Sequence, residues 1–144
     1  MSAFRLAGLL RFRKLQEDQA AADLAAANAS RRRAESRRAA ATRELVGHEF
    51  QPDLDLSVFR ASVASRAALR SFATEAAVAV EVAATDVQQH ELAWSDARKR
   101  AVPLEKLADR HAERAGVEDL RVEQLALDEI AGRGSTSTAP GGDA

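Results

Sequence analysis

The sequence predicts an all-α fold: a long antiparallel coiled coil of two helices, an α-hairpin, in which the second helix is longer than the first. Three observations lead to this prediction. The chain of 144 residues is dominated by Ala, Glu, Arg and Leu and is only 4% aromatic, a composition typical of long helices. Apolar residues recur at alternating steps of three and four along two long stretches. A single cluster of turn-forming residues separates these stretches.

The first helix is expected over residues 4–46, which contain no proline and one glycine. Twelve positions of this stretch form one heptad seam, and eight of them are apolar, as in a supercoiling helix rather than a strand. Many of these residues are alanine, so a partner helix can approach closely while each layer buries little area. The seam positions are Leu6, Leu10, Arg13, Glu17, Ala20, Leu24, Ala27, Arg31, Ala34, Arg38, Ala41 and Leu45.

The bend of the hairpin is expected over residues 47–57, which hold Gly47, Pro52 and Asp53. Asp55 or Ser57 is the expected N-cap of the helix that follows. Large apolar side chains gather near this bend. They are interpreted as packing at the tip of the hairpin, with a docking patch as the alternative. The three residues are Phe59, Leu69 and Phe72.

The second helix is expected over residues 58–131. From Leu69 onward, fourteen of its eighteen seam positions are apolar, including Trp94, which is expected in the core. Pro103 lacks an amide hydrogen and clashes with the preceding turn, so a kink or short break is expected near 99–103. The Gly-, Ser- and Thr-rich residues 132–144 are expected to be a disordered tail, which leaves residues 1–131 as a single domain.

The two predicted helices differ in length. Counting forward from the bend, residues 58–100 of the second helix should lie beside the first helix, and the chain after Pro103 should extend past the first helix. An apolar stripe without an intrachain partner indicates a binding site or self-association. The stripe consists of Leu104, Leu107, Val122, Leu125, Leu127 and Ile130.

Charge is divided unevenly between the two helices. Residues 1–46 carry ten Lys or Arg against five Asp or Glu, a net of +5, and residues 47–144 carry eleven against seventeen, a net of −6. The favoured interpretation of the arginines between 31 and 43 is therefore a solvated basic face that pairs with the acidic second helix. Contact with an acidic protein surface is the sharper hypothesis, and nucleic acid is disfavoured because no aromatics interleave. The arginines are Arg31, Arg32, Arg33, Arg37, Arg38 and Arg43.

Nothing in the sequence indicates catalysis. His48, His90 and His111 are far apart and are interpreted as polar positions of the bend and seam rather than metal ligands. The chain has no cysteine, which excludes disulfides and thiol chemistry. We therefore expect no enzyme, no metal and no cofactor. The start of the chain is interrupted by arginines and no run of 18 apolar residues exists, so neither a signal peptide nor a membrane span is expected.

Four blocks of sequence, in order along the chain, resemble the flagellar export protein FliJ family. The blocks are FRLAGLLRFRKLQEDQAA at 4–21, AWSDARKR at 93–100, PLEKLADRHAER at 103–114 and RVEQLALDEIA at 121–131. The resemblance covers essentially the whole chain. It implies an antiparallel two-helix coiled coil similar to the central shaft of rotary ATPases.

The resemblance also implies a cytoplasmic protein at the inner face of the cell membrane, at the flagellar base. Such a protein binds and stimulates the hexameric flagellar export ATPase, contacts the export-gate membrane protein and handles export chaperones, without inserting in the membrane. The gate contact would fall on Leu69, Phe72 and Ala76, with Leu45 on the first helix. The ATPase contact would fall on the termini, at Leu6, Leu10, Arg13, Leu125 and Ile130.

Two other functions stay open at this point. In one alternative, the chain is a generic scaffold coiled coil that dimerises through the end of the second helix that extends past the first. The less favoured alternative is a basic-helix protein that binds nucleic acid, whose affinity would fall steeply with salt.

Overall fold

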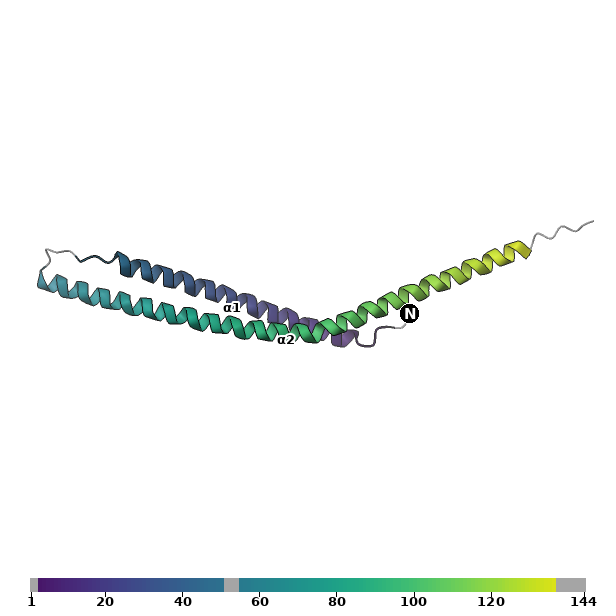
Figure 1. The fold of residues 1–144 in the computed structure, drawn as a ribbon, viewed down its shortest axis with the longest axis horizontal. Coiled ribbons are helices and arrows are strands. Elements are labelled where there is room, and N and C mark those ends of the chain that lie inside the picture. The colour runs from purple at the N-terminus through teal and green to yellow at the C-terminus, as the bar shows by residue number, and fades with distance from the viewer. Residues whose placement is uncertain (1–2, 51–54, 137–144) are drawn as a thin grey trace, which may run out of the picture.

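The computed structural model describes residues 3–50 and 55–136, with side chains to residue 134. It contains two helices, α1 (Ala7–Gly47) and α2 (Leu56–Thr136), and the described residues form no strand. The helices lie side by side as an antiparallel hairpin, and α2 continues alone well beyond the start of α1 (Figure 1). The predicted all-α hairpin with a longer second helix is confirmed.

The helix ends follow from local chemistry. α1 begins without a side-chain cap and ends where His48 turns extended, at φ −77° and ψ 104°. Gly47 is therefore the last residue of α1 rather than the first of the bend. At the start of α2, the Asp55 carboxylate accepts a hydrogen bond from the Leu56 amide at 2.8 Å and another from the Ser57 hydroxyl at 2.7 Å. Asp55 is thus the N-cap of α2, while Pro52 and Asp53 of the predicted bend lie outside the described residues.

The core is the predicted heptad seam, and it is narrow. Five apolar side chains are buried among the described residues, two from the seam of α1 and three from the seam of α2, which continues from Leu69 by alternating steps of four and three. Most other seam positions from Leu10 to Ala115 are half-buried, Trp94 among them. Arg38 and Phe59 are exposed exceptions. The buried residues are Ala27, Ala34, Val80, Val87 and Ala101.

Contacts between the helices fix the antiparallel register. At the open end the Phe4 ring lies 5.6 Å from the His111 ring, and at the tip Arg66 donates a hydrogen bond to the His48 carbonyl at 3.0 Å. The paired region therefore extends to about residue 115, where the last half-buried seam residue of α2 lies. The expectation that pairing ends near 100 is wrong, because the Glu17–Arg98 contact sets a register in which the residues before Glu17 lie beside α2 after Arg98, as far as Phe4 beside His111. Leu104, expected without a partner, is half-buried.

The part of α2 beyond the paired region, residues 116–134, is called the overhang below. Every residue of the overhang is exposed. The yellow end of α2 accordingly runs on with no neighbour in Figure 1. Helix continues through Gly116 and Gly132 to Thr136, so the predicted disordered tail is wrong for residues 132–136. The rest of that tail, residues 137–144, lies outside the described residues.

Pro103 lies inside α2, which is unbroken from Leu56 to Thr136. The short break considered for 99–103 is therefore absent. α2 instead changes direction in its green part, where the purple start of α1 lies beside it (Figure 1). A proline in a helix interior removes one backbone hydrogen bond and crowds the preceding turn, which bends a helix that packing holds together.

Candidate docking sites

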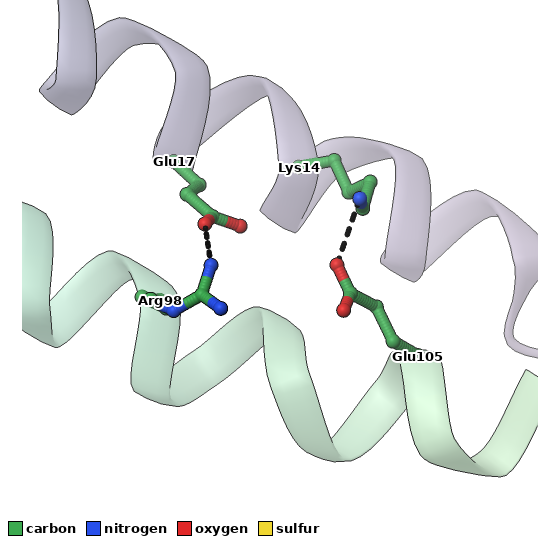
Figure 2. A network of polar contacts seen from close by, with 4 residues as sticks. All are labelled: Lys14, Glu17, Arg98 and Glu105. Atoms are coloured by element: carbon green, nitrogen blue, oxygen red, sulfur yellow. Dashed lines mark hydrogen bonds and ion pairs between the residues drawn. The ribbon is translucent and has the colours of Figure 1, made fainter.

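Two interhelical ion pairs flank Pro103 and join the start of α1 to α2 (Figure 2). The Lys14 ammonium lies 2.8 Å from a Glu105 carboxylate oxygen, and the Arg98 guanidinium lies 2.9 Å from a Glu17 oxygen. The hydrogen bond that Lys14 donates to Glu105 raises the pKa of Lys14 and lowers the pKa of Glu105. Lys14 and Arg98, one side chain of each pair, are well exposed to water, which screens the pairs, so the pairs specify register more than they stabilise the fold.

A cluster of aromatic and basic side chains closes the tip of the hairpin. The Phe50 ring lies 5.5 Å from the His48 ring and 6.1 Å from the Phe59 ring, and the Arg66 guanidinium lies 5.5 Å from the centre of the Phe50 ring. Arg66 also donates a hydrogen bond to the His48 carbonyl. Aromatic residues at the tip therefore pack against one another, as expected for Phe59, although Phe50 takes the place given to Leu69 and Phe72.

The four residues assigned to the gate contact differ in exposure. Leu45 and Leu69 each lie three residues from the His48–Arg66 contact, at the same level of the seam, and both are half-buried. Ala76 is half-buried in the seam as well. Phe72 is 62% exposed. The structure thus brings Leu45 and Leu69 together but offers only the Phe72 ring fully to a partner.

The five residues assigned to the ATPase contact fall in two separate places. Leu10 and Arg13 are half-buried in the seam and Leu6 is exposed at its start. Leu125 and Ile130 are 57% and 68% exposed on the overhang. Leu125 follows His111, which contacts Phe4, by fourteen residues, or about 21 Å of helix. The two groups therefore form two surfaces rather than one.

Large apolar side chains that the sequence analysis passed over are exposed on the first turns of α1. Leu9, Phe12 and Leu15 lie beside the seam rather than in it. Phe12 and Leu15 border a shallow groove of about 570 Å³ between the two helices, close to the bend in α2. The signal that could have found them is a second apolar stripe, offset from the first, in the same stretch of sequence. The groove is lined by Phe12, Leu15, Gln16, Gln19, Ala20, Asp23, Ala93, Asp96, Ala97 and Arg100.

The arginines of α1 do not pair with α2. In the described part of the chain their one ion pair joins Arg31 to Glu35 on the same helix, at 3.3 Å. Both interhelical ion pairs lie instead near the start of α1. The arginines do form a solvated basic face, since all but Arg31 are exposed, but the predicted pairing of this face with the acidic second helix is wrong. The arginines of α1 and most of the acidic residues of α2 lie at different positions along the rod.

The three histidines occupy structural positions. His48 packs on Phe50 at the tip, His111 packs on Phe4, and His90 is half-buried in the seam. Among the described residues, no three His, Asp or Glu side chains come close enough to hold a metal ion. Of the helices described, neither has a stretch long and apolar enough to cross a membrane.

The fold and these surfaces define a class of protein: a long helical hairpin that presents apolar and charged side chains outward along a rod. Residues 1–137 match the model of the flagellar FliJ protein family, so the chain belongs to that family. The resemblance of the four sequence blocks is thereby confirmed, and the protein is a component of the flagellar export apparatus. Comparisons with curated proteins and with solved structures find no match.

Proposed function

We propose that this protein is a non-catalytic, cytoplasmic accessory subunit that binds and stimulates the hexameric flagellar export ATPase. The observation that carries this proposal is the overhang, an exposed helix that continues beyond the paired region in a chain of the FliJ family. Its large apolar side chains are all exposed, although burial of each would contribute about 1.5–3 kcal/mol. They are Val117, Leu120, Val122, Leu125, Leu127 and Ile130.

The overhang has the shape of an inserted element. Its 19 residues extend about 28 Å, and an isolated helix of that length is only marginally stable in water. Its net charge is −3, so the surface that covers it must combine apolar side chains with basic ones. A ring of ATPase subunits around such a helix buries the apolar side chains from all sides, which suits their spread around the helix. The charges are Glu118, Asp119, Glu123, Asp128 and Glu129 against Arg121 and Arg133.

The other end of the rod is proposed to contact the export gate at the inner face of the membrane. Phe72 supports this assignment, because it is a large aromatic side chain left exposed one turn from the half-buried Leu69 and Ala76. An exposed aromatic beside a rigid seam is a typical anchor of an interface. Export chaperones complete the proposed partners, as the family resemblance implies.

The ATPase contact is tested by the hydrolysis rate of the cognate export ATPase, titrated with this protein. The wild-type chain should raise the rate, and Leu125→Glu/Ile130→Glu should abolish that increase. The matched control is Val78→Glu/Val82→Glu, since these valines are exposed to a similar degree on the paired part of α2. An unchanged rate with the wild-type chain, together with no co-purification, contradicts the proposal.

The gate contact needs a separate measurement. Phe72→Ser should weaken binding to the purified cytoplasmic part of the export-gate protein, while Phe12→Ser, at the far end of the paired region, should not. Both rings are exposed, so neither change empties the core. Equal binding by the two variants would remove Phe72 from the gate contact without affecting the ATPase assignment.

A further inference from the structure

The arginine patch of α1 is the most concentrated charge on the rod that has no neutralising partner. It consists of Arg31, Arg32, Arg33, Arg37, Arg38 and Arg43. The six side chains span about 18 Å of helix, and with Glu35 the stretch 31–43 carries a net charge of +5. All but Arg31 are exposed. Apart from the pair between Arg31 and Glu35, no arginine of the patch is ion-paired within the described residues.

The neighbouring helix does not supply the missing carboxylates. The register set by the His48–Arg66 and Glu17–Arg98 contacts places residues 71–83 of α2 beside the patch. This segment contains Glu75 and Glu81, and neither forms an ion pair with the patch. Five guanidinium groups are therefore available to a molecule that approaches from outside.

Arg31 and Arg38 are seam positions, and the other four arginines lie on two flanks of α1, to either side of the line that faces away from α2. Arg33 and Arg37 are one helical turn apart on one flank, and Arg32 and Arg43, eleven residues apart, share the other. A guanidinium offers a planar fork of donors that matches a carboxylate. Two flanks at this spacing fit an elongated partner that lies along α1 with carboxylates on both edges.

We propose that the arginine patch is a docking surface for an acidic segment of another protein, a contact that does not depend on the overhang or on the ATPase. The residues between the arginines are Ala, Ser, Thr and Glu. They offer no aromatic ring for stacking bases and no large apolar side chain for insertion among lipids. Glu35 and Glu44 interrupt the basic track and would repel a continuous chain of phosphates.

The proposal is tested by fluorescence anisotropy with a labelled 18-residue peptide of Glu and Ala as the probe. Arg33→Glu/Arg37→Glu should weaken binding by about tenfold or more, because two favourable charges become repulsive. The matched control is Arg110→Glu/Arg114→Glu, a second exposed pair of arginines one turn apart with no ion pair. That control should bind within about twofold of the wild-type chain, and binding by the wild type should weaken as salt rises.

Arg32→Gln/Arg43→Gln, on the other flank, provides a second variant if the charge reversal lowers the helix content measured by circular dichroism. Equal losses in the patch and control variants would overturn the proposal. So would tighter binding, at the same salt concentration, to a random DNA duplex or to vesicles of phosphatidylcholine with 30% phosphatidylglycerol. If the chain sediments as a dimer and Arg33→Glu/Arg37→Glu converts it to a monomer, the patch binds a second copy of this chain, and the proposal of another protein is overturned.

Discussion

Val87 offers the sharpest test of the narrow core, because it is one of the few buried side chains larger than alanine and is only 3% exposed. Val87→Ala removes two methyl-sized groups from the seam, at about 0.8 kcal/mol each, and leaves a small cavity. The higher helix propensity of alanine returns about 0.5 kcal/mol. The expected net loss in the free energy of unfolding is about 1.5 kcal/mol.

The matched control is Val82→Ala, the same substitution five residues earlier in α2, at a side chain that is 64% exposed. Here the gain in helix propensity remains while little burial is lost, so stability should stay level or rise by up to about 0.5 kcal/mol. The assay is urea unfolding followed by circular dichroism at 222 nm. With a slope of about 1.5 kcal/mol per molar urea, the Val87 variant should unfold at about 1 M less urea than the wild type. Equal midpoints for the two variants would refute the assigned seam.

Three further outcomes follow from the ends, the bend and the ion pairs of the rod. The Lys14–Glu105 hydrogen bond lowers the pKa of Glu105, so it stabilises the fold at neutral pH, and this contribution is lost as the pH falls through that lowered pKa. Lys14→Met should therefore lose less unfolding free energy than the wild type as urea titrations are repeated at increasingly acid pH. The same dependence of unfolding free energy on pH in both proteins would contradict the pairing. Pro103→Ala restores a backbone hydrogen bond inside α2 and should raise the free energy of unfolding by about 1–3 kcal/mol, whereas a decrease would show that the bend is needed for packing. Hydrogen bonds from Ser57 and Leu56 lower the pKa of Asp55, so Asp55→Ala should speed amide exchange in the first turn of α2 while Asp55→Asn preserves it; equal exchange in both variants would argue against the cap.

The two helices and the seam could be predicted because a heptad pattern states directly which residues face a partner helix. The end of the paired region could not. Its position depends on the register of the two helices, which places Glu17 beside Arg98 and Phe4 beside His111 and which the heptad pattern alone does not set. The end of α2 was also beyond the sequence pattern. Glycine is common where a helix ends and the chain turns, but it does not by itself end a helix, and α2 continues through Gly132.

The docking residues were harder to predict for a related reason. Apolar periodicity finds the residues that the fold itself covers, and two residues that the family resemblance assigned to a partner, Leu10 and Arg13, are among them, half-buried against α2. Exposed apolar residues that a partner could cover lie off that line, as Phe12 and Leu15 do. Leu125 and Ile130 escaped this limit, because α2 continues past the start of α1 and its apolar residues become exposed there.

The arginine patch shows a second limit of sequence reasoning. Net charges of opposite sign on two antiparallel helices suggest that they neutralise each other, but the sum ignores the level at which each charge lies. The acidic excess of α2 is greatest in the overhang, beyond the reach of Arg33 or Arg43. Only the register, fixed by contacts such as Glu17–Arg98, separates the two regions.

The central claim is that the overhang is exposed in the isolated protein and becomes covered by the export ATPase. Hydrogen exchange followed by mass spectrometry tests it most directly, on this protein alone and with a saturating amount of the ATPase. Amides of residues 116–134 should exchange rapidly in the isolated chain, where the helix has no neighbour, and slow strongly in the complex. Slow exchange of this segment in the isolated chain, or protection by the ATPase confined to the paired region, would contradict the account.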